Sequence, residues 1–403
     1  MTKYEFLEVP HNQSIMLTDL SKALLQRRAA GLYRTRTISD GPQSTRMTID
    51  GETFLAFCSN DYLALANDPE LLAAASLGLD RYGIGAGASH LINGHSQAHH
   101  ELEKTLADFT RFPRALLFST GYMANMAVAT ALLGRHDAIF ADRFNHASLN
   151  DAALLSQASL RRYHHLDLDH LESQLAQTPA KCKLVMTDAV FSMDGDCAPI
   201  DDLLVLCQRF GAWLLVDDAH GFGVLGEQGR GSLFQTHFPE NHVPHLIYMA
   251  TLGKAAGVAG AFVAAQTEVI ETLIQQGRTY GYTTASPPLL AHTLLTSLQI
   301  IAQQSWRREQ LVRLIERLRQ GLVSLPWQLL PSTTAIQPLL VRDNEQALQL
   351  STALRERGIW VPAIRPPTVP KGTARLRITL SAAHTLVEID QLTLTLRDLA
   401  NTL

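Results

Sequence analysis

The chain has 403 residues, a net charge of −4 at neutral pH, 46% hydrophobic residues and 18% charged residues. This composition is typical of a globular protein, and the length favours two domains over one. A weakly acidic chain without a block of lysines or arginines argues against nucleic acid as a partner. No apolar run reaches the length that spans a membrane.

Two further features concern where the protein works. The N-terminus, which reads MTKYEFLE, has no apolar core of a signal peptide. The four cysteines are scattered, and no Cys/His cluster has the spacing of a zinc site. The sequence therefore predicts no metal site and a reducing, cytoplasmic compartment.

The N-terminal part begins with a predicted helix over residues 16–36, in which Leu17, Leu20, Leu24 and Leu25 share one face. Residues 48–57 alternate loosely and predict a hairpin that turns at Asp50 and Gly51. The polar segment 59–63 then leaves a strand as a loop.

Two glycine-rich stretches match the dinucleotide-binding pattern as letters only. Residues 83–88 follow a segment, 71–79, with helical rather than strand spacing. Residues 221–226 do follow a strand, but the segment after them does not open a helix. Both contexts are wrong for a nicotinamide dinucleotide, so the first stretch is interpreted as a mobile glycine loop.

From residue 115 onward, short apolar strands alternate with helices. Helices are expected at 99–109, 123–133, from 149, and at 201–210. Strands are expected at 115–118, 138–141, 183–190, 212–216, in the apolar run before Lys254, and at 261–265. Repeated strand–helix units with apolar strands predict a mostly parallel sheet that is covered by helices on both faces, an α/β fold.

The last quarter of the chain has a different pattern. An amphipathic stretch at 298–322 is expected to cross into a second domain. Beyond it, strands are predicted at 335–341 and 375–380, and helices at 345–357 and 386–399. The prolines of the loop 364–370 are expected to hold Arg365. We divide the chain into an N-terminal segment (1–58), a large domain (59–297) and a C-terminal α+β domain (298–403).

The polar residues that follow the predicted strands suggest a binding site. In an open parallel sheet, ligands gather at the carboxyl ends of the strands. Lys254 follows one apolar strand, and Asp217 with His220 follows another. Pyridoxal phosphate needs a lysine for its aldehyde and a carboxylate opposite its ring nitrogen, so Lys254 and Asp217 are the candidates, and His220 is expected to reach the ring hydroxyl.

Other parts of the site are predicted with less support from the residues alone. Gly121, Tyr122 and Thr251 are candidates for the phosphate cradle, because Gly121 and Tyr122 lie where a strand turns into a helix N-terminus. That segment is equally typical of a tight turn. His146 could stack on the cofactor ring, but a lone histidine there is more often a capping or surface residue. The motifs Asp-x-x-His and Thr-x-x-Lys follow two strands in this order along the chain. Their joint occurrence favours a cofactor site over a purely structural role for these residues.

The motifs then resemble a known family. The chain is similar to the α-oxoamine synthases, which are fold-type I pyridoxal-phosphate enzymes. The resemblance spans nearly the whole chain and rests on SNDYL at 59–63, STGY at 119–122, NHAS at 145–148, VFSMDGD at 190–196, DDAHG at 217–221 and TLGK at 251–254. It implies a seven-stranded, mostly parallel sheet of the aspartate aminotransferase type and a homodimer.

The resemblance also implies roles. Lys254, His146, Asp217 and His220 would be catalytic, and Ser192 would join His220 at the ring hydroxyl. The residues expected to contact substrate are Arg34, Asn60, His146, Arg365 and Thr368. The segments IRPPTVP at 364–370 and TARLR at 373–377 resemble those of the family members that act in biotin biosynthesis. These enzymes condense L-alanine with pimeloyl-CoA or pimeloyl-acyl-carrier protein. Residues 283–286 would complete the neighbouring subunit's phosphate site.

Two departures and two alternatives remain. The family often has glutamate where Asp188 stands, so that the shorter side chain is expected to reach its partner through water. The glycine loop reads GAGASH at 85–90 rather than a Gly-Ser-Gly-Gly-Ser type. One alternative is another condensation in the family, such as glycine with acetyl-CoA. The other is a binding protein that has kept the fold without turnover, which an intact Lys254 disfavours.

Overall fold

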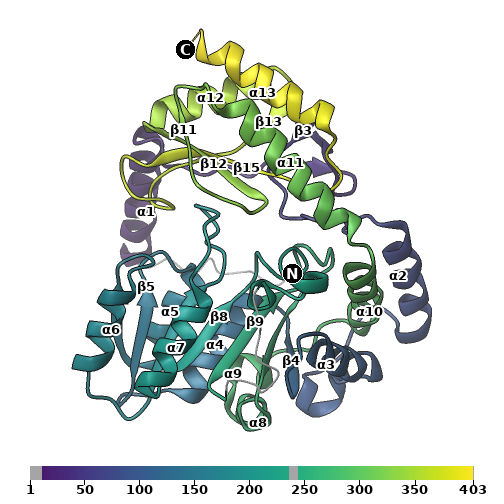
Figure 1. Cartoon of the computed structure of the whole chain (residues 1–403), viewed down its shortest axis with the longest axis vertical. Helices are drawn as coiled ribbons and strands as arrows, with labels where there is room; N and C mark the ends of the chain where they lie inside the picture. The colour runs from purple at the N-terminus through teal and green to yellow at the C-terminus, as the bar shows by residue number, and fades with distance from the viewer. Residues whose placement is uncertain (1–10, 236–243, 403) are drawn as a thin grey trace, which may run out of the picture.

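The computed structural model describes residues 11–235 and 244–402. In Figure 1 a large twisted sheet with helices on both sides forms the lower part of the molecule. A smaller part, with its own sheet and helices, lies above it and carries the C-terminus. The long N-terminal helix runs along one edge of the view.

The large sheet has seven strands in the order β4-β10-β9-β8-β7-β5-β6. All neighbours from β9 to β6 are parallel, and only β10 runs antiparallel to both of its neighbours, β4 and β9. The strands are β4 (Arg114–Phe118), β5 (Ala138–Asp142), β6 (Ser159–Tyr163), β7 (Lys183–Asp188), β8 (Trp213–Asp217), β9 (Leu246–Thr251) and β10 (Ala261–Ala265). The predicted α/β fold with a mostly parallel seven-stranded sheet is confirmed.

Both faces of this sheet are buried. Successive side chains of a strand point to opposite faces, and the core accordingly divides into two apolar clusters. In β8 and β9, Val216 and Tyr248 pack in one cluster, and Leu215 and Met249 pack in the other. This burial explains why the central strands are almost wholly apolar and why their polar residues occur at the ends.

Helices cover the two faces. Those of the large part are α2 (Pro69–Tyr82), α3 (Gln97–Phe109), α4 (Gly121–Leu132), α5 (Ala147–Ser156), α6 (Leu168–Gln177), α7 (Ile200–Phe210), α8 (Thr267–Gln276), α9 (Arg278–Gly281) and α10 (Pro288–Gln303), with single turns η1 (His90–Gly94), η2 (Glu227–Gly229) and η3 (Ser232–Phe234). Residues 83–89 form a loop between α2 and η1, and only a short turn follows residues 221–226. Neither glycine stretch opens a regular α-helix after a strand, which agrees with the rejection of dinucleotide binding.

The upper part contains two further sheets. One has the order β11-β12-β15-β14, and the other has the order β1-β2-β3-β13. Their strands are β1 (Ser39–Asp40), β2 (Arg46–Ile49), β3 (Glu52–Ala56), β11 (Gln328–Leu329), β12 (Ile336–Arg342), β13 (Ile359–Trp360), β14 (Ala363–Ile364) and β15 (Ala374–Thr379), and their helices are α11 (Trp306–Leu322), α12 (Asn344–Glu356) and α13 (Leu386–Ala400). Because β3 pairs with β13, the N-terminal hairpin shares a sheet with the C-terminal part. The division of the chain at residues 58 and 297 stays a prediction.

Two element boundaries were predicted wrongly. The first helix, α1 (His11–Ala29), ends well before residue 36, because Gly31 adopts φ 66, a left-handed conformation that stops a helix. The stretch 298–322 is not continuous, since α10 ends at Gln303 and α11 starts at Trp306. The hairpin at Asp50 and Gly51 is confirmed by the pairing of β2 with β3.

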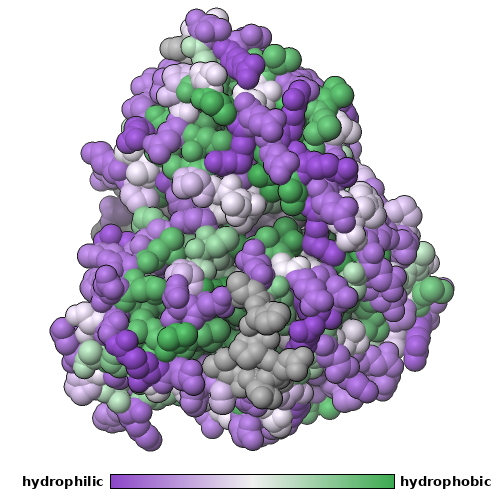
Figure 2. Space-filling model, viewed as in Figure 1, coloured by the Kyte–Doolittle hydropathy of each residue, from purple (hydrophilic) through white to green (hydrophobic). Residues whose placement is uncertain are grey.

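The surface seen in Figure 2 is mainly hydrophilic, with smaller apolar patches between the charged and polar side chains. Among the described residues, no helix combines the length and the apolar character needed to cross a bilayer.

Candidate active site

The polar ends of the central strands gather around one cavity of about 680 Å³. Seven of the predicted residues line it, although they come from distant parts of the chain: Arg34, Asn60, His146, Ser192, His220, Lys254 and Thr368. The others, Gly121, Tyr122, Asp217, Thr251 and Arg365, are not part of that lining. The parallel order of β5, β7, β8 and β9 brings the ends of these strands to one edge of the sheet.

Lys254 is paired with His220. Its Nζ lies 2.8 Å from Nε2 of His220, and Nδ1 of the same ring lies 2.5 Å from the hydroxyl of Tyr62. Burial lowers the pKa of Lys254 to about 8, although the charge of Asp217 opposes this shift. Burial also holds the pKa of His220 well below its ordinary value, and the charge of Lys254 adds to the effect. A neutral imidazole therefore faces an amine that loses its proton readily.

Asp217 ends β8 beside β9, where it pairs with Met249. Its side chain is 4% exposed. It accepts hydrogen bonds from Asn125 Nδ2 at 2.8 Å and from the amide of Ala219 at 3.0 Å. Burial raises the pKa of Asp217, whereas Asn125 and the charge of Lys254 oppose that rise. Within residues 11–235 and 244–402 this buried carboxyl forms no ion pair, so it lacks a cationic partner in direct contact.

His146 is fixed by its neighbours at the start of α5. Its Nδ1 lies 2.8 Å from the hydroxyl of Ser148, which also accepts a hydrogen bond from Asn125. Its amide donates to Asp188 Oδ2 at 2.6 Å. Asp188 therefore contacts the backbone of His146 directly, and the predicted contact through water stays a prediction. Burial and the nearby charge of Asp217 raise the pKa of Asp188 well above its ordinary value.

The predicted phosphate cradle lies at the N-terminus of α4. Gly121 and Tyr122 are the first helical residues, and Thr120 caps the helix by accepting from the amide of Met123. The first amides of a helix have no acceptor within it, and the helix dipole favours an anion there. Thr251, at the end of β9, donates its hydroxyl hydrogen to Gly260 O. The hydroxyl of Tyr122 already donates a hydrogen bond to Asp151.

The structure separates two arginines of the C-terminal part, Arg365 in the loop after β14 and Arg377 in β15. Arg365 donates to the carbonyl of Gly31, and its buried Nε has no hydrogen-bond partner among the described residues. Arg377 instead lines the cavity of Lys254. Arg377 is 6% exposed, and its guanidinium donates hydrogen bonds to Ser192 O and Asn60 Oδ1. The prediction did not single out Arg377, although an arginine within a buried strand such as β15 is itself a signal.

Tyr62 and Asn125 were also missed as individual site residues. Asn125 is a fully buried polar residue in the otherwise mostly apolar helix α4, and its only described partners are Asp217 and Ser148. Such a residue points to a function, because burying an amide costs free energy unless hydrogen bonds replace water.

The residues that are present fit pyridoxal phosphate. Asp217 is a buried acceptor without an ion pair, which suits a protonated ring nitrogen. Lys254 is an amine whose pKa is lowered by burial, which suits condensation with an aldehyde. The helix N-terminus at Gly121 suits a phosphate. A cation, an aldehyde and an anion on one molecule match the three parts of this site.

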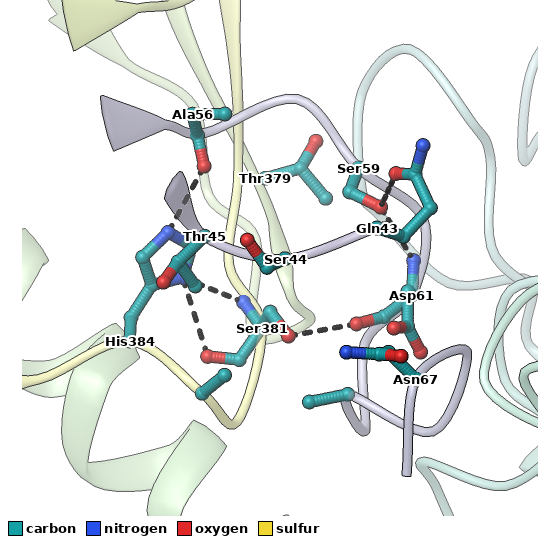
Figure 3. A pocket seen from close by; sticks show the side chains of 12 residues that line it. Gln43, Ser44, Thr45, Ala56, Ser59, Asp61, Asn67, Thr379, Ser381 and His384 are labelled. Carbon is teal, nitrogen blue, oxygen red and sulfur yellow. Dashed lines mark hydrogen bonds between the residues drawn. The ribbon is translucent and has the colours of Figure 1, made fainter. Parts of the chain in front are cut away.

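A smaller cavity of about 180 Å³ lies where the N-terminal hairpin meets β15 (Figure 3). Its polar groups are bonded mainly to each other and to backbone: His384 contacts Ala56 O and the backbone of Ser381, and Ser381 donates to Asp61 O. No lysine or arginine lines it. It therefore lacks the chemistry of the larger cavity.

Comparisons with known proteins agree with this site. The sequence pattern of the class I and II aminotransferases matches residues 52–396. The 8-amino-7-oxononanoate synthase of Nitrosomonas eutropha is 70% identical over 96% of this chain and 100% of its own length. The solved 8-amino-7-oxononanoate synthase of Francisella tularensis has a TM-score of 0.74 and 32% identity, covering 87% of this chain and 98% of its own. A serine palmitoyltransferase of S. paucimobilis with bound PLP–myriocin has a TM-score of 0.88 and 28% identity, covering 96% and 98%.

Proposed function

The chain belongs to the class I and II aminotransferase family and to its 8-amino-7-oxononanoate synthases, and we propose that it condenses L-alanine with a pimeloyl thioester. The products are 8-amino-7-oxononanoate, CO2 and a free thiol, and the enzyme is a pyridoxal-phosphate-dependent acyltransferase of biotin biosynthesis. The observation that carries the proposal is the contact of Lys254 with His220 at a cavity beside the buried carboxyl of Asp217.

The cofactor would be held by residues from several strand ends. Lys254 would bind its aldehyde carbon, and Asp217 would face its ring nitrogen, where a positive charge would compensate the buried carboxylate. Ser192 and His220 would contact the ring hydroxyl, and His146 would lie against the ring. Gly121 and Tyr122, together with Thr251, would bind the phosphate at the N-terminus of α4. When bound, the cofactor withdraws electrons from the α-carbon of the amino acid, so that this carbon becomes acidic and then nucleophilic.

The chain's own residues would move the proton. The Nζ of Lys254 is the base that takes the proton from the α-carbon of L-alanine, because its lowered pKa leaves much of the amine neutral near pH 8. The neutral ring of His220, 2.8 Å away, orients the amine. Tyr62 fixes His220 and Asn125 fixes Asp217, each through a hydrogen bond.

Charged and polar side chains at the mouth of the cavity would bind the substrates. Arg377 is placed to bind the carboxylate of L-alanine, since it lines the same cavity as Lys254. Arg365, which the resemblance places among the substrate-binding residues, retains one unpaired donor and is the alternative. Arg34 donates to the hydroxyl of Thr368, so these two residues with Asn60 would border the acyl substrate.

We further infer that the enzyme is a homodimer. The apolar face of α1 is exposed, with Leu17 at 65% and Leu20 at 52%. Near the glycine loop, Ile84 and Tyr282 are about four-fifths exposed, and Ala285 donates to Ala88 O. Large apolar side chains that gather on a surface mark protein contacts. The segment 283–286 would then complete the phosphate site of the neighbouring subunit.

The compartment is inferred from the thiols. All four cysteines are free, and burial raises the pKa of Cys58 and Cys197 to about 11. Free thiols persist in a reducing compartment, which supports a cytoplasmic location.

The decisive experiment is thiol release from pimeloyl-CoA by the protein loaded with pyridoxal phosphate. We expect release that depends on L-alanine and yields one CO2 per thiol. Acetyl-CoA with glycine is the comparison, since a faster reaction of that pair would identify a different condensation of the same class. A pimeloyl-acyl-carrier protein is assayed beside pimeloyl-CoA, and the larger kcat/KM identifies the acyl donor. A loaded protein that releases no thiol from any donor would refute the proposal.

A further inference from the structure

A second cavity adjoins the one that Lys254 lines. It has a volume of about 300 Å³. The two cavities share six lining residues: Phe144, Asn145, Ser192, Met193, Pro367 and Thr368. A substrate bound beside Lys254 can therefore extend past these residues into the second cavity.

Six of the eleven residues that line the second cavity are apolar, so apolar and polar groups share its walls about equally. Phe191 and Val369 are buried there, and the other apolar lining residues are the exposed Phe144 together with Met193, Pro367 and Pro370. Such walls suit a methylene chain, because burying apolar surface is favourable whereas burying unpaired polar groups is costly.

Two charged side chains also line this cavity, and only one of them is unpaired. The carboxylate of Asp194 is bound by the buried guanidinium of Arg375. Arg143 follows β5, and its amide donates to Tyr163 O at 3.2 Å. Within the described part of the chain, the guanidinium of Arg143 makes no hydrogen bond or ion pair. The second cavity thus offers one unpaired cation, the solvent-exposed Arg143, beside several apolar side chains.

We propose that Arg143 binds the distal carboxylate of an ω-carboxyacyl thioester and so selects this acyl group over a plain fatty acyl group. The inference rests on the proposed function and names the part of the acyl donor that the second cavity recognises. A guanidinium binds a carboxylate through two parallel N–H bonds, and the apolar side chains of the lining would cover the methylenes. Asp194 does not compete for Arg143, because Arg375 neutralises it.

The phosphates of CoA are the other anions that could reach Arg143. They carry several charges, whereas the second cavity offers a single unpaired cation and a set of apolar side chains beside it. A single carboxylate at the end of a hydrocarbon chain matches that lining better.

The test compares two acyl donors of equal length, pimeloyl-CoA and heptanoyl-CoA, which differ only in the distal carboxylate. We expect Arg143→Gln to raise the KM for pimeloyl-CoA about tenfold to a hundredfold. The KM for heptanoyl-CoA, or its inhibition constant if it is not turned over, should stay within about twofold, since that ligand never uses the cation. Arg143→Lys should restore part of the affinity for pimeloyl-CoA. Arg161→Gln, an exposed arginine that lines neither cavity, is the matched control.

Each other outcome overturns the inference in a recognisable way. Equal losses with both donors would mean that Arg143 contacts the CoA phosphates or only supports the fold. Unchanged constants for both donors would mean that the distal carboxylate binds elsewhere. Wild-type protein that releases no thiol from either donor would refute the proposed function itself, and the carboxylate subsite with it.

Discussion

The Nζ of Lys254 lies 2.8 Å from Nε2 of His220, although the two residues follow different strands, β9 and β8. The strands are parallel neighbours, so both residues leave the sheet at the same edge. Tyr62 holds the other ring nitrogen. The contact places a lysine of lowered pKa against a neutral imidazole, and the predictions below test what this arrangement does.

Replacing Lys254 by alanine removes the amine that binds the aldehyde and accepts the proton. We expect thiol release to fall by about a thousandfold or more, and the visible absorbance of the bound cofactor to disappear. Lys181→Ala, an exposed lysine away from the cavity, should change neither signal. An unaltered absorbance band in Lys254→Ala would show that another group holds the cofactor.

The rate at which pyridoxal phosphate binds the cofactor-free protein should depend on pH. Only the neutral amine attacks an aldehyde, and burial lowers the pKa of Lys254 from 10.5 to about 8. The rate should therefore rise between pH 6 and 8 and level off above about pH 8.5. Stopped-flow absorbance measures it. A rate that keeps rising to pH 10 would indicate a lysine with an ordinary pKa.

Asp217→Asn keeps the shape of the side chain but removes the charge. If Asp217 faces the ring nitrogen, kcat should fall by about a hundredfold to a thousandfold. The thermal midpoint should also fall somewhat, because Asn125 and Ala219 donate to different carboxylate oxygens and asparagine keeps an oxygen for only one of them. Asp202→Asn, an exposed substitution on α7, is the control. Full activity in Asp217→Asn would remove this residue from the reaction.

The KM for L-alanine should show whether Arg377 or Arg365 binds the carboxylate of this substrate. Arg377→Gln should raise this KM about tenfold to a hundredfold, because Arg377 lines the cavity of Lys254. Arg365→Gln should leave it within about twofold, because Arg365 binds the carbonyl of Gly31. The reverse order would assign the carboxylate to Arg365 instead.

The stability of the protein should depend on His165. This ring is partly buried, which lowers its pKa, but bonds of 2.9 Å to Asp142 and Asp196 outweigh burial and raise the pKa to about 9. A raised pKa means that the stabilisation is complete below the ordinary value of 6.5 and is lost as the pH rises through 9.

We expect wild type to exceed His165→Asn in unfolding free energy by about 1 to 2 kcal/mol more at pH 6 than at pH 10, a value reduced from the full shift because solvent screens the pair. Urea unfolding at the two pH values measures the difference. A gap between the two proteins that does not change with pH would contradict the ion pairs.

The alternation of apolar strands and amphipathic helices was enough to predict the α/β fold, because the periods of the two elements differ and both faces of the sheet must be buried. The boundary errors have local causes. Gly31 ends α1 through a left-handed backbone conformation, and no residue pattern announced the break between α10 and α11.

The sequence by itself determined which residue types stand at the strand ends, Lys254 and Asp217 among them, since an amine or a carboxyl at the end of an apolar strand is costly unless it is used. Only the tertiary structure decided which side chains meet. Arg377 and Tyr62 reach the cavity, whereas Arg365 turns toward Gly31, because these contacts join residues far apart in the chain. Spacing along the chain carries no information about such encounters, which depend on strand order and on how the three sheets pack together.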